Sequence, residues 1–245
     1  MLRCTRLQPL ASHFFTAANL KLRDDHREWA SLAAQAGLAR ERLRLLHQVH
    51  GRTVATAGAA ERWTQPDADA VISDDPSVAL VVRVADCAPI LIADRRLGVV
   101  AAVHAGWRST LQRIAVAAVG ALAETYGSNP DDLVVAIGPS LGACCGEMGE
   151  EVVEAFRRAG HDERAIARWF LQQPGAGPHF DLWRANREQL ESAGVAAGSI
   201  HVSGLCTRSH PDVFHSYRAV GPGAGRMAAV IRASRADQPP RNGSV

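Results

Sequence analysis

No apolar run in this sequence approaches the roughly 18 residues that a membrane-spanning helix requires. The N-terminal stretch MLRCTRLQPLASHFF also lacks an apolar segment of the length found in secretory signal peptides. Both absences argue against export and membrane insertion. We therefore expect the protein to be cytoplasmic and not to bind membranes.

Cysteine is scarce, and its count is odd. The five cysteines are Cys4, Cys87, Cys144, Cys145 and Cys206. A disulfide framework is typical of small secreted chains with an even set of cysteines, and a chain of 245 residues with five cysteines does not fit that description. We expect reduced thiols or metal ligands. The adjacent pair at 144 and 145 is interpreted as structural or incidental, and Cys206 as a small buried residue.

Charge of one sign is not concentrated anywhere in the chain. The 27 Lys and Arg residues nearly balance the 25 Asp and Glu residues, and the basic residues are scattered rather than gathered in runs. Binding to nucleic acid or to an anionic membrane surface requires a basic patch or run. We therefore expect no nucleic-acid partner, whereas small anionic ligands fit this composition. No obligate protein partner is predicted.

Apolar residues are abundant enough for one complete core. Hydrophobic residues make up 47% of the 245 residues, and nothing in the composition forces a division into two domains. We expect a single domain over residues 1–232. The tail 233–245, which contains DQPPRNGSV, has no apolar pattern and is expected to be disordered.

Strands outnumber helices in the pattern of apolar residues. After a short strand near His13, apolar or β-branched runs bounded by Gly, Pro, Asp or Ser predict further strands: RLRLLHQV, ADAVIS, VALVVRV, PILIAD, GVVAAVHA, DLVVAIG, IHVSG, VFHSYR and RMAAVIR. Helical spacing predicts four helices: HREWASLAAQAGL, STLQRIAVAAVGALAETYG, GEEVVEAFRRAG and DLWRANREQLESAG. In the second helix, Ser109 or Thr110 would cap the start and Gly127 the end. The predicted fold class is α/β or mixed α+β, with large mixed β-sheet layers flanked by helices.

Three potential metal ligands lie at the ends of predicted strands. The stretches HQVHG, VADCAP and AVHAGWR place His50, Cys87 and His104 at strand ends, where side chains can converge without disturbing a packed core. Two imidazoles and one thiolate suit Zn²⁺, and three protein ligands leave the fourth tetrahedral position to water or substrate. Spacing alone favours three unrelated turn residues, because neither a CxxC pair nor an HExxH helix is present. His47 would point to the opposite face of an extended strand and is left out of the site.

Several motifs occur in the order seen in one known family. They are HQVHG, DADAVIS, ADCAPILIAD, VHAGWRST, IGPSLGACCGEMGEEV, DLWRANREQL, the CT at 206 and 207, and FHSYRAVGPGAGRMAAVI. From about Asn19 to Ile231 the chain resembles the YfiH-like family, also called laccase-domain or polyphenol-oxidase-like, whose members are described as purine nucleoside phosphorylases. The resemblance implies a single α/β domain of the YfiH/CNF-like cysteine-hydrolase type. It also implies a zinc site whose ligands match His50, Cys87 and His104.

The sequence departs from that family pattern at three places. FFTAANL runs directly into a segment that follows an Arg-containing, Gly-rich stretch in the family, so a substrate-facing arginine is missing from that position. Ser109 stands where glycine is usual, and His215 stands where a second phenylalanine is common. These departures concern activity and substrate preference more than fold.

The resemblance implies phosphorolysis of adenosine, inosine and methylthioadenosine to the free base and ribose 1-phosphate, together with deamination of adenosine. For deamination, zinc would activate a water for attack on purine C6, and Asp86 and Glu147 are the candidates for moving the proton. Each has a structural alternative. Asp86 would satisfy backbone N–H groups in a turn, and Glu147 would open a helix whose dipole its charge suits.

Phosphorolysis calls for fixed cations near the phosphate and the ribose, and arginine binds phosphate oxygens as a bidentate fork. Arg108, Arg218 and Arg226 lie in the matching motifs and are the candidates for binding substrate and phosphate. Their structural alternatives are capping or pairing at a helix start for Arg108, and carboxylate partners on predicted strands for the other two. The catalytic residues implied are Asp86, Cys87, Arg108 and Glu147.

Three other functions remain open. A metal-free hydrolase or amidase would use Cys87 as nucleophile and His104 as base, and would act in peptidoglycan precursor editing, with which some bacterial members of the family are associated. A copper-dependent polyphenol oxidase, or laccase, needs about ten histidines largely in HxH pairs; this chain has ten histidines and no HxH. Copper in the protein would more simply be an adventitious occupant of the zinc site. A regulatory module without catalysis is the third alternative.

Overall fold

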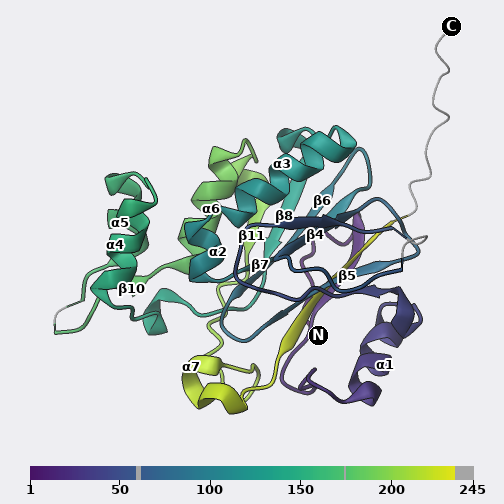
Figure 1. Cartoon of the computed structure of the whole chain (residues 1–245), viewed down its shortest axis with the longest axis horizontal. Coiled ribbons are helices and arrows are strands. Elements are labelled where there is room, and N and C mark those ends of the chain that lie inside the picture. Colours follow the sequence, from purple (N-terminus) through teal and green to yellow (C-terminus); the bar gives the residue numbers. More distant parts are fainter. Residues whose placement is uncertain (59–61, 174, 235–245) are drawn as a thin grey trace, which may run out of the picture.

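The computed structural model describes residues 1–58, 62–173 and 175–234. Over these residues the chain forms two packed β-sheets with helices on the outside (Figure 1). This mixed α/β architecture confirms the predicted fold class. The strands do not join into one large sheet, however, but are divided between these two sheets and a separate two-stranded sheet.

The larger sheet has six strands and is mixed. It contains β3 (Val54–Thr56), β4 (Ala70–Ser73), β6 (Ala88–Asp94), β7 (Val100–Ala105), β8 (Leu133–Ile137) and β11 (Ile200–Val202), in the order β11-β8-β6-β7-β4-β3. The central strands β6, β7 and β8 are buried along their whole length, which is why their sequences are almost uninterrupted apolar runs. Helices cover one face of this sheet in Figure 1: α2 (Trp107–Leu111), α3 (Ile114–Tyr126) and α6 (Leu182–Ser192).

The smaller sheet has four strands and lies against the other face. Its strands are β1 (Ala11–Phe15), β2 (Leu43–Arg44), β5 (Ala79–Val84) and β12 (Met227–Ala233), in the order β1-β12-β5-β2. Alternation along β5 sends Leu80 and Val82 into the core between the sheets. It sends Ala79 and Val81 toward the cluster under α1 (His26–Gln35). The molecule therefore has four layers, with a helical layer outside each sheet.

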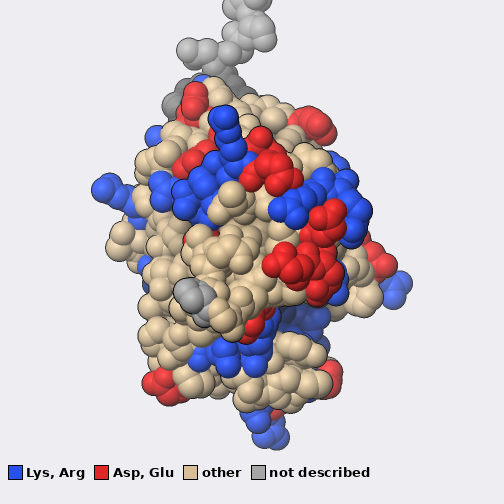
Figure 2. Space-filling model, turned by 90° about the vertical axis from the view of Figure 1, so that its left-hand side faces the viewer, with Lys and Arg blue, Asp and Glu red and all other residues tan. Residues whose placement is uncertain are grey.

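A side lobe holds α4 (Glu150–Arg158), α5 (Glu163–Trp169), β9 (Phe170–Leu171) and β10 (His179–Phe180). Ion pairs join its helices to each other and to α6, with Arg157 3.1 Å from Glu163 and Arg168 2.7 Å from Glu188. Figure 2 views the molecule from this side and shows basic and acidic side chains intermingled over its upper part. Among the described residues, no helix combines the length and apolar character needed to cross a bilayer.

The predicted helix 109–127 is two helices. Arg113 adopts the left-handed conformation, with φ 59°, and separates α2 from α3. The cap of α2 is Gly106 rather than Ser109 or Thr110, because both hydroxyl residues are fully buried within α2 and Thr110 contacts α6. Gly127 ends α3 with φ 73°, as predicted.

Three other boundaries differ from the prediction. RLRLLHQV is a strand only over β2, and VFHSYR is a turn followed by α7 (Tyr217–Val220), whose start is capped by Ser216. Strand β12 includes Ala233, so regular structure extends one residue past the predicted domain end at 232. Residues 235–245 of the predicted disordered tail lie outside the described residues. Short 3-10 turns complete the chain: η1 (Arg40–Arg42), η2 (Pro130–Asp132), η3 (Ala143–Cys145), η4 (Ala197–Ser199) and η5 (Gly221–Gly223).

Candidate metal centre and pocket

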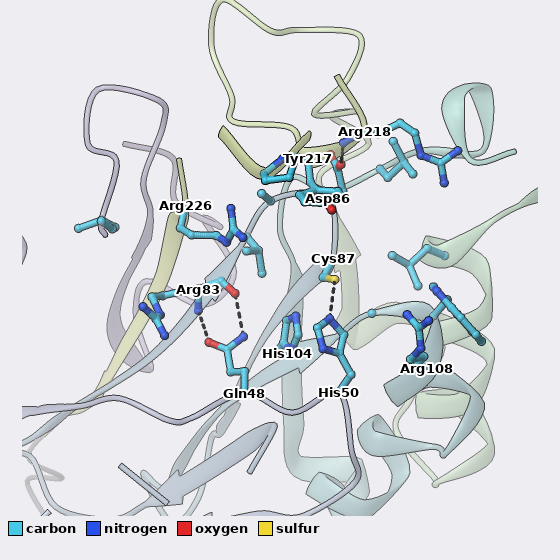
Figure 3. A pocket seen from close by; sticks show the side chains of 18 of the residues that line it. Gln48, His50, Arg83, Asp86, Cys87, His104, Arg108, Tyr217, Arg218 and Arg226 are labelled. Atoms are coloured by element: carbon cyan, nitrogen blue, oxygen red, sulfur yellow. Dashed lines mark hydrogen bonds between the residues drawn. The ribbon is translucent and has the colours of Figure 1, made fainter. Parts of the chain in front are cut away.

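The side chains of His50, Cys87 and His104 converge at one end of the two sheets (Figure 3). Their ligand atoms all lie within 4.8 Å of one another, and Cys87 Sγ is 3.8 Å from His50 Nε2. A tetrahedral zinc ion bound to one sulfur and one imidazole nitrogen would hold those two atoms about 3.6 Å apart. The structure therefore brings together the three residues that the sequence suggested.

Each ligand reaches this point from a different part of the fold. Cys87 lies in the short crossing between β5 and β6, where the chain passes from the smaller sheet to the larger one. His104 lies on β7 and pairs in register with Pro89 of β6. His50 follows β2 in a loop and has a left-handed backbone, with φ 59°. Residues far apart in sequence thus meet because two strand ends and one loop share an edge.

A buried carboxylate that the sequence analysis missed holds this arrangement. Asp69 is fully buried, and its Oδ1 lies 2.7 Å from His104 Nδ1. The same carboxylate accepts hydrogen bonds from the backbone N–H groups of Val49, His50 and Gly51. Such a carboxylate orients a ligating histidine and fixes which ring nitrogen is free for the metal. The available signal was an acidic residue directly before the apolar strand in DADAVIS.

The electrostatics of the site favour a thiolate. Burial raises the pKa of the Cys87 thiol, but the charge of His104 and hydrogen bonds from both imidazoles lower that pKa to about 6. Burial lowers the pKa of His104, but the charge of Cys87 and the hydrogen bond to Asp69 raise it to about 9. These opposite shifts favour a thiolate at Cys87 with the proton held by His104. A thiolate suits a nucleophile, and it also suits a metal ligand, in which case the ion would displace the proton from His104 because a ligating imidazole is neutral.

Gly106 has no side chain, and this leaves room for the candidate ligands Cys87 and His50 to approach each other. A Cβ at this position would lie 2.8 Å from Cys87 Sγ and 3.1 Å from His50 Cδ2. Both contacts are shorter than van der Waals distances, so one or both ligands would have to move.

Gly106→Ala is expected to weaken binding of zinc by about tenfold, because displaced ligands cannot keep the coordination distances. Competition with a chromophoric chelator measures this affinity. Gly120→Ala in α3 is the matched control, because a Cβ there meets nothing within 4 Å. Equal zinc affinity in the two variants would contradict the steric argument.

The three ligands line a pocket of about 950 Å³, which is large enough for a nucleoside and phosphate. Figure 3 shows Arg83 and Arg226 together on one side of the ligands and Arg108 on the other. The aromatic side chains of Trp107, Phe180 and Tyr217 also line the pocket. Its walls thus combine cationic groups with flat apolar surfaces.

The three predicted arginines all line this pocket, but two were placed on the wrong elements. Arg218 lies on helix α7, and Arg226 directly precedes β12; neither is within a strand. Neither makes an ion pair with a carboxylate in the described part of the chain. Arg218 donates to the carbonyl of Glu147 over 2.8 Å, and Arg226 donates to the carbonyl oxygens of Ala224 and Gly225.

Arg108 is exposed at the start of α2, where its guanidinium stacks over the Trp107 ring, 4.2 Å from the centroid. Asp86 lines the pocket with φ 85°, and its two carboxylate oxygens accept from the Thr207 hydroxyl and from the Arg218 backbone N–H, each over 2.6 Å. Asp86 thus accepts from one backbone N–H group, but that group belongs to α7 and not to the turn that carries Asp86.

Glu147 is placed differently from the prediction. It lies before α4 rather than in it, and its Oε1 accepts from the backbone N–H of Gly177. It does not line the pocket that contains Cys87. The carboxylate of Glu147 thus stabilises the loop at Gly177, and the geometry does not place it beside Cys87.

Arg83 is a second pocket residue that the sequence analysis did not single out. It is the one charged residue within β5, and its main chain exchanges two hydrogen bonds with the Gln48 side chain. Burial and the nearby charge of Arg226 lower the pKa of Arg83. A charged residue inside the apolar run VALVVRV was the signal. The two guanidiniums together form a cationic wall that an anion would stabilise.

His47 is not in the group of three candidate ligands, although the extended strand on which that expectation relied ends at Arg44. Its Nδ1 lies 2.7 Å from Asp67, and both side chains are exposed. His215, one of the departures from the family pattern, has its Nε2 2.9 Å from the Leu20 carbonyl oxygen. That residue thus serves a contact between two loops.

Comparison with known proteins gives consistent matches. The family model described as "Multi-copper polyphenol oxidoreductase laccase" matches residues 4–234. A purine nucleoside phosphorylase of Deinococcus radiodurans is 40% identical over 205 residues, which are 82% of this chain and 74% of the relative. Adenosine deaminase RL5 from an unknown prokaryotic organism is 36% identical over 205 residues, 80% of this chain and 77% of the relative. A purine nucleoside phosphorylase of Bacteroides thetaiotaomicron is 37% identical over 163 residues, 66% of this chain but only 60% of the relative.

Solved structures agree with the fold. The crystal structure of the Bacillus licheniformis hypothetical protein YfiH superposes with a TM-score of 0.84 at 25% identity, covering 92% of this chain and 94% of that chain. The structure of YlmD from Geobacillus stearothermophilus superposes with a TM-score of 0.80 at 29% identity, covering 91% and 89%. The two-sheet architecture is therefore shared with both.

Proposed function

The chain belongs to the family described as multi-copper polyphenol oxidoreductase laccase, and on this premise we propose that it is a zinc-dependent purine nucleoside enzyme. Relatives named purine nucleoside phosphorylase and adenosine deaminase support a purine nucleoside enzyme at the level of the family. The proposed reactions are phosphorolysis of adenosine, inosine and methylthioadenosine, and deamination of adenosine. A cytoplasmic location stays a prediction.

The donor set supports zinc as the metal. His50, Cys87 and His104 offer two imidazole nitrogens and one sulfur with a lowered pKa, a combination that hard cations such as Mg²⁺ disfavour. Bound zinc would supply Lewis acidity beside the substrate, and three protein ligands would leave it accessible. Asp69 would keep the His104 imidazole oriented toward the ion and would hold the backbone of the loop that carries His50.

The cationic wall supports binding of phosphate. Arg83 and Arg226 line the pocket and form no ion pair in the described part of the chain. The charge of Asp24 offsets that of Arg83 only in part, because the pKa of Arg83 is still lowered, so an anion would stabilise the two guanidiniums. Phosphate held there would be near the ribose, and the guanidinium forks would orient it for attack on the anomeric carbon. Arg226 was already a candidate for binding phosphate from the sequence, whereas Arg83 was not.

The remaining pocket residues fit the nucleoside. Trp107 and Tyr217 line the pocket, where an aromatic ring would stack with a purine, and Arg108 lies over the Trp107 ring beside them. Arg218 reaches the pocket from α7. We assign Asp86 a positioning role, because its carboxylate joins α7 and Thr207 to the turn that carries Cys87. Its transfer of a proton during deamination stays a prediction.

The observation that carries the proposal is the convergence of the three ligands at a pocket with a cationic wall. We expect inosine and phosphate to yield hypoxanthine and ribose 1-phosphate, detected by chromatography. Cys87→Ala is expected to lower the rate by at least about a hundredfold, because it removes a metal ligand. Zinc content is measured in the same samples. Absence of product from inosine, adenosine and methylthioadenosine with the zinc-loaded wild type would end the proposal.

A second candidate is a metal-free hydrolase acting on peptidoglycan precursors, with Cys87 as nucleophile and His104 as base. The thiolate–imidazolium charge state favours it. Chelation separates the two candidates: the zinc enzyme loses phosphorolysis and regains it with zinc, whereas the hydrolase still cleaves a muropeptide precursor without metal. Phenol oxidation with added copper would be assigned to copper in the same ligand set, since copper outcompetes zinc at most nitrogen and sulfur sites.

A further inference from the structure

A second group of thiols lies outside the pocket. Cys144 and Cys145 belong to η3, and Cys206 belongs to a segment much later in the chain, yet their Sγ atoms all lie within 4.8 Å of one another. The Sγ atoms of Cys144 and Cys145 are 3.7 Å apart. The Ser209 hydroxyl oxygen lies 3.6 Å from the first of these and 3.4 Å from the second. Three residues that the sequence suggested were incidental or merely buried therefore form one cluster.

We propose that Cys144, Cys145 and Cys206 bind a second zinc ion, with the Ser209 hydroxyl at the fourth corner. Two sulfurs bound to one tetrahedral zinc ion stand about 3.8 Å apart, and a sulfur and an oxygen stand about 3.6 Å apart. The measured separations of 3.7, 3.6 and 3.4 Å match those edges closely. Cys144, Cys145 and Ser209 thus have the spacing of one face of a coordination tetrahedron, and Cys206 Sγ, within 4.8 Å of both other sulfurs, stands beside that face.

The surroundings of Cys206 favour a ligand over an inert buried thiol. Its Sγ accepts a hydrogen bond from the backbone N–H of Gly142 over 3.3 Å, and an N–H that points at sulfur stabilises the thiolate form. A disulfide between two of the cysteines would leave the third thiol without a role. Zinc would engage all three, releasing one proton per thiol with no change of oxidation state.

This ion would fasten the two segments that hold Asp86 next to the first metal centre. Ser140 pairs with Cys206 as an isolated bridge, and the backbone N–H of Thr207 donates to the Ser140 carbonyl. On the Asp86 side, the backbone N–H of Leu141 donates to the Asp86 carbonyl and the Thr207 hydroxyl donates to its carboxylate. We therefore assign the thiol cluster a structural role behind the pocket rather than a catalytic role within it.

Zinc content tests the inference directly. After purification with reductant and dialysis against metal-free buffer, elemental analysis is expected to find about two zinc ions per wild-type chain. Cys144→Ser/Cys145→Ser is expected to retain only the ion held by His50, Cys87 and His104. Cys87→Ala should retain only the ion of the thiol cluster, and Cys4→Ser, outside both clusters, should retain both.

Cobalt substitution gives a second readout. The thiol cluster would contribute three sulfur-to-cobalt charge-transfer interactions and the first centre only one, so most of this absorption should disappear in Cys144→Ser/Cys145→Ser. Ser209→Cys is expected to raise zinc affinity at least about tenfold, because a fourth thiolate replaces a weak hydroxyl ligand. A gain of affinity cannot arise from misfolding. Equal zinc content and equal cobalt absorption in wild type and Cys144→Ser/Cys145→Ser would overturn the inference, whatever the fate of the first centre.

Discussion

Asp69→Ala is expected to lower the stability of the fold by about 3–5 kcal/mol and to weaken zinc binding at the first centre by about 10- to 100-fold. The loss of stability arises because the His104 ring and the N–H groups of His50 and Gly51 would all lose their common partner in a buried site. The loss of affinity arises because neither the His104 ring nor the loop that carries His50 would then be held in place. Denaturant unfolding and zinc titration measure the two effects separately.

Asp69→Asn separates charge from shape. The amide keeps an oxygen acceptor for the loop N–H groups, so this variant is expected to fold while still binding zinc more weakly. Asp67→Asn is the matched control, because Asp67 is exposed and its carboxylate pairs with the exposed His47. Asp69→Ala with wild-type zinc affinity and wild-type stability would show that this carboxylate orients nothing.

The pH dependence of unfolding also reports on the Asp69 carboxylate. Burial raises the pKa of Asp69, but its hydrogen bonds from His104 and from the loop amides hold that pKa below its ordinary value of 3.8. A carboxyl group whose pKa is lower in the folded state stabilises the fold above the unfolded pKa and loses that contribution as pH falls through the folded value. As pH falls below the unfolded pKa of 3.8, the wild type should therefore lose stability more steeply than Asp69→Asn.

Arg83→Ala is expected to raise the KM for phosphate by about a hundredfold, the effect of removing a positioned donor to a charged substrate. Arg83 and Arg226 stand close enough to disfavour each other's charge, and a phosphate between them would relieve that repulsion. Initial rates of inosine phosphorolysis at varied phosphate measure the effect. Deamination, which needs no phosphate, is expected to fall far less.

Two further variants define the role of the guanidinium. Arg83→Lys keeps the charge but not the fork, and is expected to recover only part of the lost phosphate affinity. Arg187→Ala is the control, because Arg187 is on α6 and pairs with Glu191 on the surface. An unchanged KM for phosphate in Arg83→Ala would remove this residue from the phosphate site and leave Arg226 and Arg108 as the candidates.

The parts of the fold that the sequence predicted well are those decided by local pattern. Strands β5, β6 and β7 are apolar runs with turn residues between them, and their ends carry Cys87 and His104. Where tertiary contacts override the local pattern, prediction failed. Thr110 belongs to a helical pattern, yet its hydroxyl is buried against Asn186 of α6, and Arg113 then breaks the helix.

The resemblance to a known family, and not the spacing, selected His50, Cys87 and His104 as candidate ligands, and neither signal identified the residues that support them. Asp69 and Arg83 acquire their roles only when other strands or loops are placed around them, because nothing adjacent in the sequence marks a carboxylate as shared by four donors. The thiol cluster is similar. Cys206 meets Cys144 only because Ser140 pairs with Cys206 across two segments distant in the chain.

The passage of the chain between its two sheets has a thermodynamic consequence. Cys87 lies in the connection from β5 to β6, and His50 in the connection from β2 to β3, so both residues lie where the chain crosses between the two sheets. A metal ion bound to them and to His104 would link the two sheets at this end of the molecule. Binding of the ion and separation of the sheets would then be linked equilibria: separation would release the ion, and a higher concentration of free zinc would make separation less frequent.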